Sequence, residues 1–188
     1  MLAAYTLSKA IDDASDFDEQ PMNPYDLRVE WALSRQDVRQ RLVLSALFNL
    51  PFAEAEEQGS GRERSDLMQA ILSHIEVAPL ITLSSGLTGA DEEHSHAFPL
   101  ASRPLGLARN SLHTPRFFNV ALRAVKYIPL RERRCLDFVL EFFNLFNHPN
   151  VLALNSLYRS GATGLSTFGA PIAFTAPRQV RLSIDFEF

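Results

Sequence analysis

The chain has 188 residues, a formal net charge of −4, a sequence pI near 5.7 and 46% hydrophobic residues. This composition argues against wholesale disorder and against a dedicated nucleic-acid binder, which usually carries a basic face. The single cysteine excludes an internal disulfide, and no apolar run approaches the roughly 18 residues of a membrane helix. Transmembrane β-strands are not excluded, because their alternation of apolar and polar residues hardly changes the mean hydropathy, here −0.05.

The first half of the chain contains three segments in which apolar and polar residues alternate, and such alternation predicts strands with one apolar face. They lie near residues 2–11, 41–52 and 68–83, and residues 27–41 between the first two could include a short helix. Their apolar positions are Tyr5 and Leu7, then Leu42, Leu44, Ala46, Phe48, Leu50 and Phe52, then Ile71, Ile75 and Val77. The helix would place Leu27, Trp31 and Ala32 on one side.

Residues 117–128 and 134–146 alternate in the same way and are joined by a short polar turn, so they predict a β-hairpin. A turn centred on Arg131 would place apolar residues opposite apolar ones, with the parity that one shared face requires. The expected pairs are Leu122 with Leu140, Val120 with Phe142, and Ala121 with Glu141.

The last segment, near residues 178–188, alternates most strictly. Its even positions are apolar (Val180, Leu182, Ile184, Phe186 and Phe188), and its odd positions are polar or charged (Arg181, Ser183, Asp185 and Glu187).

The connections between these segments alternate in length. Those at 12–40, 84–116 and 147–177 are each about 30 residues long, whereas 53–67 and 129–133 are shorter. Long loops at one end and short turns at the other are typical of outer-membrane β-barrels. The sequence therefore predicts an all-β fold: an antiparallel meander of about six strands that forms an incomplete portion of a large transmembrane β-barrel.

Several motifs, in order along nearly the whole chain, resemble the barrels of TonB-dependent receptors, most closely the Oar-like subset. They are residues 5–13 (YTLSKAIDD), 23–28 (NPYDLR), 32–34 (ALS), 37–41 (DVRQR), 117–123 (FFNVALR), 141–147 (EFFNLFN) and 177–179 (PRQ) with the strand that follows. The family often has His at the position of Gln40.

The resemblance implies a segment of an outer-membrane transporter whose full-length relatives take up nutrients. Such receptors carry a plug domain, which these motifs do not include, so we expect residues 1–188 to be a C-terminal barrel fragment, from a truncated gene or a partial gene model, that is inactive alone. The expected localisation is the cell outer membrane. The expected partners are outer-membrane lipid and the barrel-assembly machinery, with a plug domain and the TonB energy-coupling system only in a full-length parent; no nucleic-acid partner is expected.

The candidate functional residues follow from the strand faces. Charged residues opposite the apolar stripe would face the barrel lumen: Arg123, Asp137, Glu141, Arg181, Asp185 and Glu187. Phe186 and the terminal Phe188 resemble an assembly signal. His94 and His96 are weak metal candidates, since a solvated acidic loop explains them more simply. No catalytic motif accompanies the serines and histidines, so we expect neither enzyme activity nor a cofactor.

Two alternatives share the strand pattern. A soluble β-sheet binding module would bury the apolar stripe in a sandwich and use the long loops for recognition. A passive porin or adhesion-type barrel would share the lipid-facing stripe and lack the family motifs.

Overall fold

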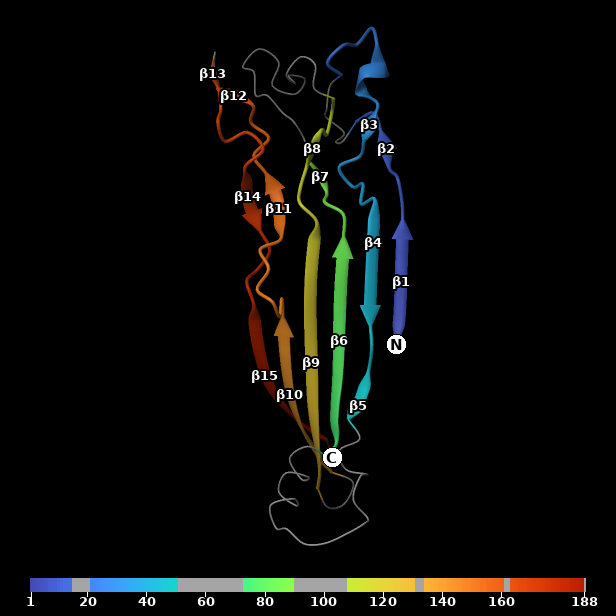
Figure 1. Cartoon of the computed structure of the whole chain (residues 1–188), viewed down its shortest axis with the longest axis vertical. Coiled ribbons are helices and arrows are strands. Elements are labelled where there is room, and N and C mark those ends of the chain that lie inside the picture. The colour runs from blue at the N-terminus through green and yellow to red at the C-terminus, as the bar shows by residue number, and fades with distance from the viewer. Residues whose placement is uncertain (15–20, 51–72, 90–107, 131–133, 161–162, 188) are drawn as a thin grey trace.

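The computed structural model describes residues 1–14, 21–50, 73–89, 108–130, 134–160 and 163–187. Six long strands pair in chain order in one sheet (Figure 1). A short strand, β5 (Phe48–Leu50), pairs with β6 beyond the end of β4 in the same register. The long strands are β1 (Leu2–Leu7), β4 (Gln40–Ser45), β6 (Ile75–Ser84), β9 (Phe117–Pro129), β10 (Cys135–Phe143) and β15 (Gln179–Glu187).

Every neighbouring pair in this sheet is antiparallel, and the order β1-β4-β6-β9-β10-β15 contains no crossover. The predicted all-β antiparallel meander is therefore confirmed. Strands β1 and β15 each have a partner on one side only, so the sheet has two open edges.

The register places the apolar stripes of all six strands on one face, which we call the apolar face. For example, Leu140 lies opposite Leu182 on one side and Ala124 on the other. The apolar face includes Tyr5, Leu42, Leu44, Phe48, Ile81, Leu83, Phe118, Val120, Leu122, Phe138, Leu182, Ile184 and Phe186. Most polar and charged residues of the same strands lie on the opposite face, which we call the charged face; the register places Gln40 and Lys126 on the apolar face.

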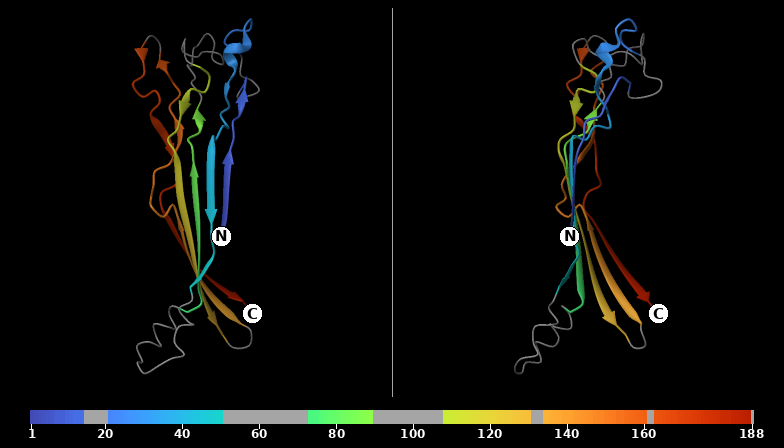
Figure 2. Two further views of the ribbon diagram at one scale, coloured as in Figure 1. Left: turned by 45° about the vertical axis from the view of Figure 1, so that its right-hand side comes forward. Right: turned by 90° about the vertical axis from the view of Figure 1, so that its right-hand side faces the viewer.

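The sheet is a single twisted layer, and the lower ends of β9, β10 and β15 swing away from that of β6 (Figure 2). On the apolar face Leu182 and Ile184 are 78% and 63% exposed. On the charged face Val125 and Val139, directly opposite each other, are only 5% and 3% exposed. Val120, on the apolar face, is also buried, at 8% exposed, so exposure is greatest on the edge strands β1 and β15 and lower at the centre of the sheet.

The β9–β10 hairpin corrects the expected register. The pairs Leu122–Leu140, Val120–Phe142 and Ala121–Glu141 do not form; instead Phe142 lies opposite Leu122, Leu140 opposite Ala124 and Glu141 opposite Arg123. The pairing is symmetric about position 132 rather than Arg131, and the Leu130 N–H donates to the Arg134 carbonyl at 2.8 Å to close the connection. Moving the centre by one residue shifts each partner by two, so the faces are unchanged.

The expected helix within residues 27–41 is limited to one 3-10 turn, η1 (Leu27–Glu30). The Asp26 carboxylate caps this turn by accepting the Arg28 N–H at 3.2 Å, and Trp31 is already extended. A longer helix would gain little, because Trp31 is 63% exposed and has no core to cover. The chain instead enters a strand, β3 (Ala32–Leu33), which pairs with β2 (Ile11–Asp12).

Short two-stranded ribbons extend the sheet at its upper end in Figure 1. One consists of β2 and β3, and another of β7 (Thr88–Gly89) and β8 (Leu112–His113). Above β10 and β15, β11 (Val151–Leu154) pairs with β14 (Pro171–Phe174), and β12 (Arg159–Ser160) pairs with β13 (Thr163–Gly164).

Candidate functional site

Three of the predicted lumen residues form a charged row across the sheet. The register sets Glu141 of β10 directly between Arg123 of β9 and Arg181 of β15. One Glu141 carboxylate oxygen lies 4.0 Å from Arg123 Nε and the other 3.5 Å from Arg181 Nη1. The Arg181 guanidinium also lies over the ring of Phe143, 5.7 Å from its centroid. The row therefore joins three strands through one carboxylate on the charged face.

A second row, which crosses β10 four residues before Glu141, is acidic. Asp137 and Asp185 lie directly opposite each other, and Asp137 is largely buried. The Cys135 thiol lies 3.0 Å from a carboxylate oxygen of Asp137 and donates to it. Glu187 occupies the register position opposite Cys135. Like charges placed directly opposite each other repel, so this end of the charged face favours a cationic neighbour.

Of the two residues predicted to form the assembly signal, the structure describes only Phe186. Phe186 lies on the apolar face, opposite Leu136 of β10, and is 52% exposed. Phe188 lies outside the described residues, as do the weak metal candidates His94 and His96. Within the described part of the chain no group of three His, Cys, Asp or Glu side chains could hold a metal ion.

An asparagine-rich corner, residues 144–150, connects β10 to the upper ribbons, and the sequence did not predict its role. Asn144 and Asn147 adopt left-handed backbone conformations with φ of 51° and 53°, so β10 ends at Phe143. The buried Asn150 amide accepts from the Phe118 N–H at 2.7 Å and donates to the Phe118 carbonyl at 2.8 Å. Beyond the end of β10, this side chain thus takes the place of a neighbouring strand for β9.

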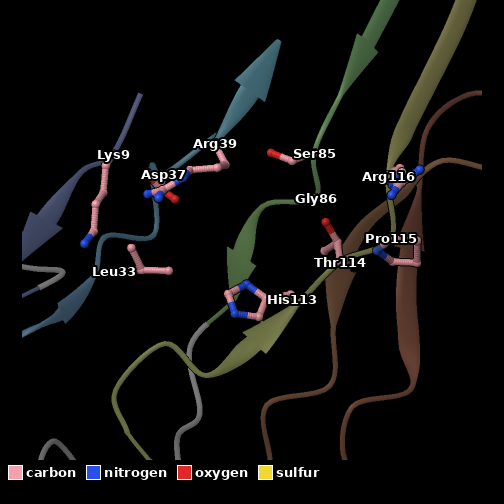
Figure 3. A pocket seen from close by; sticks show the side chains of 10 residues that line it. All are labelled: Lys9, Leu33, Asp37, Arg39, Ser85, Gly86, His113, Thr114, Pro115 and Arg116. Atoms are coloured by element: carbon pink, nitrogen blue, oxygen red, sulfur yellow. The ribbon is translucent and has the colours of Figure 1, made fainter. Parts of the chain in front are cut away.

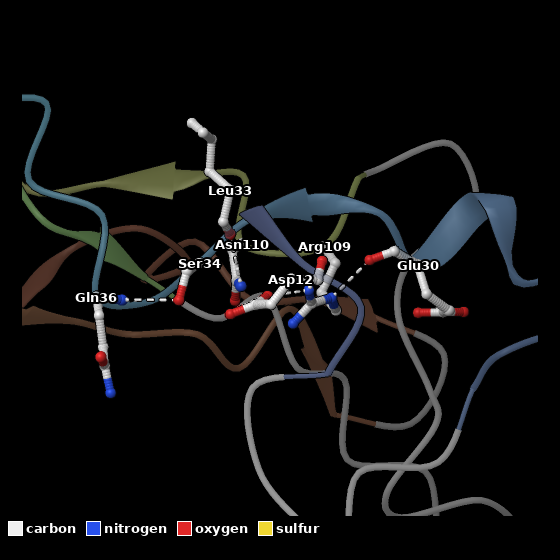
Figure 4. Close-up of polar contacts among 7 residues, drawn as sticks. All are labelled: Asp12, Glu30, Leu33, Ser34, Gln36, Arg109 and Asn110. Atoms are coloured by element: carbon white, nitrogen blue, oxygen red, sulfur yellow. Dashed lines mark hydrogen bonds and ion pairs between the residues drawn. The ribbon is translucent and has the colours of Figure 1, made fainter. Parts of the chain in front are cut away.

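A second polar cluster, centred on Arg109, holds three loop segments together at the upper end (Figure 4). The buried guanidinium bonds to the Asp12 carboxylate and, through Nε, donates to the Glu30 carbonyl at 2.9 Å. Asn110 donates to the Leu33 carbonyl, also at 2.9 Å. These contacts tie the segment before β8 to β2, η1 and β3.

The Arg109 cluster determines the ionisation of Asp12. Desolvation by burial raises the pKa of this carboxyl group, but hydrogen bonds from Ser34 and Arg109 and the charges of Arg109 and Arg35 outweigh it. The net effect holds the pKa of Asp12 below its ordinary value. No sequence periodicity marks this cluster, because Asp12 and Arg109 come from different long loops.

A cleft opens at the upper end of the sheet, in the fork between the β2–β3 and β7–β8 ribbons (Figure 3). It has a volume of about 690 Å³. Lys9, Asp37 and Arg39 line one side of it, and His113 and Arg116 line the other. Gly86 lies at the base of the fork, where an added Cβ would come within 1.6 Å of the Thr114 carbonyl oxygen. Only glycine allows the two segments to approach this closely.

Comparison with known families decides what the sheet belongs to. The family model described as "Outer membrane beta barrel domain" matches residues 1–90 and 94–181, nearly the whole chain. The chain belongs to this outer membrane beta barrel family. The family assignment explains why a single sheet layer exposes a continuous apolar face, since a barrel wall turns that face to lipid.

The other comparisons add no relative to this outer membrane beta barrel domain. No curated protein and no solved structure matches the chain. In the described part of the chain, no helix has the length and hydropathy needed to cross a membrane.

Proposed function

We propose that this outer membrane beta barrel domain forms six strands of the wall of a TonB-dependent receptor of the Oar-like type, located in the cell outer membrane. The apolar face contacts the lipid hydrocarbon, and the charged face lines the lumen. The observation that carries the proposal is the apolar face that continues across all six strands and is exposed on β1, β6, β10 and β15, opposite a face that bears the Arg123–Glu141–Arg181 row.

The length of the apolar stripe supports this placement. On β9 the stripe runs from Phe118 to Ala124, between Arg116, just before the strand, and Lys126 near its end. The ten residue-to-residue steps from Arg116 to Lys126 span about 33 Å along a strand, or about 25 Å across the bilayer at the usual tilt. This is the height of the apolar band of a membrane barrel. The Lys126 ammonium reaches the Ser73 carbonyl, which keeps its charge at the rim of the stripe.

The open edges support an incomplete barrel. Membrane barrels have about eight strands at least, because every backbone group in lipid must be paired. Six strands with two free edges do not meet that requirement, so the remaining strands must come from another segment or chain. The chain alone is then no pore. In a complete barrel, a plug domain would fill the lumen against the charged face, with energy supplied by the TonB system; the barrel-assembly machinery would insert the strands.

The family motifs favour TonB-dependent uptake over a passive porin or adhesion-type barrel. The corner at residues 144–150, which includes the Asn-Leu-Phe-Asn motif, lies at the junction of β9, β10 and β15. The soluble binding module is disfavoured, because within the described residues the apolar face of β15 is left exposed rather than buried in a sandwich.

Cysteine labelling of neighbouring positions on β15 tests the membrane placement. In a Cys135→Ser background, single Leu182→Cys and Ser183→Cys variants are made in a chimera whose barrel is completed by the preceding strands of a TonB-dependent receptor. The chimera is reconstituted in lipid vesicles and treated with a water-soluble maleimide. We expect Ser183→Cys to react and Leu182→Cys to react only after detergent is added. Rapid labelling of Leu182→Cys in intact vesicles would refute a lipid-facing position and favour the soluble module.

A chimera tests the transport assignment separately. Residues 1–188 replace the corresponding last strands of a well-behaved TonB-dependent receptor, and substrate uptake is measured in cells with and without the TonB energy-coupling system. We expect uptake that depends on the TonB system. Uptake of equal rate without it would identify a passive barrel wall.

A further inference from the structure

The cleft in the fork between the two upper ribbons carries an unusual charge. Lys9, Arg39 and Arg116 line it and are exposed. In the part of the chain that the structure describes, none of these three side chains makes an ion pair or a hydrogen bond. Three cations that face one cleft without a partner repel each other, so an anion in the cleft would be stabilised.

Asp37 is the acidic residue that lines the cleft, but its carboxylate is buried and engaged by the backbone. Asp37 is only 4% exposed, and its Oδ1 accepts the Ala10 N–H at 2.7 Å. Its carboxylate thus holds the β1–β2 connection in place. Three cations and one carboxylate give the cleft a formal charge of about +2 from Lys9, Arg39, Arg116 and Asp37.

The cleft also continues into an apolar surface. A second cavity, of about 900 Å³, shares Arg39 and Arg116 with the first. It is also lined by Tyr5, Leu83 and Phe118, which belong to the apolar face of β1, β6 and β9. Next to Phe118, the rings of Phe146 and His148 lie with their centroids 5.9 Å from its own. Cations above aromatic and aliphatic side chains match a ligand with an anionic head and an apolar tail.

We propose that the fork cleft binds the phosphate group of an anionic membrane lipid, with Arg39 and Arg116 as its main contacts and Lys9 as a further charge. The lipid's acyl chains lie along Tyr5, Leu83 and Phe118. This inference rests on the proposed membrane placement, because the cleft lies at the level where that placement sets the lipid headgroups. A free phosphorylated solute would use the cations alone and leave the adjoining apolar cavity empty.

Lipid binding to the same chimeric barrel in nanodiscs tests the proposal. Nanodiscs of phosphatidylcholine are doped with increasing amounts of spin-labelled phosphatidic acid, and lipid held at the protein surface is measured by electron paramagnetic resonance. The variants are Arg39→Gln/Arg116→Gln and, as a matched control, Arg28→Gln, which removes a 91% exposed arginine outside the cleft. Inorganic phosphate and spin-labelled phosphatidylcholine are the competing probe and the reference lipid.

We expect saturable immobilisation of phosphatidic acid over phosphatidylcholine. The double variant should weaken it at least about tenfold, because each basic residue near a lipid surface contributes a several-fold preference for anionic lipid. Arg28→Gln should retain the parental affinity, and millimolar inorganic phosphate should not displace the lipid. Equal affinity of the double variant and the parent would overturn the proposal, and displacement by inorganic phosphate would identify a site for free anions.

A control measurement distinguishes the lipid site from the membrane placement. Leu182→Cys and Ser183→Cys are introduced singly into the double variant in the Cys135→Ser background, and their maleimide labelling is compared with that of the parent. If the pattern is parental while phosphatidic acid binding is unselective, the lipid site is wrong and the barrel wall stands. If Leu182→Cys labels freely in the parent, the membrane placement itself is wrong.

Discussion

Replacing Asn150 by alanine should destabilise the junction between β9 and the upper ribbons more than any exposed polar substitution. Asn150 is 2% exposed, and its amide forms both hydrogen bonds to the Phe118 backbone. Without it, the Phe118 N–H and carbonyl that point away from β6 have no partner. Each buried group left unpaired costs about 1–3 kcal/mol, so for the two groups we expect a loss of about 2–6 kcal/mol in the free energy of unfolding.

The measurement uses the same chimeric barrel reconstituted in lipid vesicles. Urea unfolding followed by circular dichroism gives the change in stability, and amide hydrogen exchange at Phe118 gives the local effect. The matched control is Asn23→Ala, which removes the exposed bond that the Asn23 side chain accepts from the Tyr25 N–H at 3.0 Å and should cost only about 0.5–1.5 kcal/mol. If exchange at Phe118 were unchanged in Asn150→Ala, or if the two variants lost equal stability, the role of Asn150 would be refuted.

Three other variants test the charged groups and the last strand. The pKa of Asp12 is held below 3.8, so its contact with Arg109 stabilises the fold above that value and is lost as the pH falls through the folded-state pKa. The urea midpoints of the parent and Asp12→Asn should therefore differ at about pH 6, and this difference should vanish near pH 2. Glu141→Gln removes two exposed ion pairs and should cost about 1 kcal/mol at low salt and less in 1 M salt, whereas Asp185→Asn relieves the repulsion with Asp137 and should cost nothing in the same titration. In a full-length barrel in cells, deletion of Phe188 should reduce the membrane-inserted fraction far more than Phe174→Ala or Phe186→Ala; equal insertion of the deletion and the parent would make the terminal aromatic an ordinary lipid-facing residue.

The faces of the sheet were predictable because they depend only on the parity of the alternation. Leu182 and Asp185 lie on opposite faces wherever β15 pairs, so an error in register does not move them. The register itself was not predictable. The turn after Pro129 could centre on Arg131 or one residue later. These two centres place Glu141 opposite Ala121 or Arg123, and parity does not distinguish them because the two residues share a face. The structure brings Arg123 to Glu141, where charge complementarity adds to the strand pairing.

The loop contacts could not be read from the sequence, because they join residues far apart in the chain. Arg109 bonds to Asp12 across 97 positions, and Asn150 bonds to Phe118 across 32. Polar residues in a long loop show no period, so nothing in the sequence distinguishes Arg109 from a solvated arginine. The short helix was overestimated for a related reason: Leu27 and Trp31 have helical spacing, but β3, which begins at Ala32, pairs with β2 and requires an extended chain there.

The corner at residues 144–150 shows how a chain leaves a β-sheet while the backbone of the neighbouring strand keeps its hydrogen-bond partners. Asn144, Asn147 and Asn150 recur every three residues, and each amide binds a backbone group of another residue: His148, Arg178 and Phe118 in turn. Asp would lack the donor that Asn144 and Asn150 use, whereas Asn147 acts as an acceptor, and Gln would extend each amide by a methylene group. An Asn-x-x-Asn-x-x-Asn run directly after an alternating segment is therefore a signature of such an exit. It could locate the upper boundary of the barrel wall in sequences whose aromatic motifs have diverged.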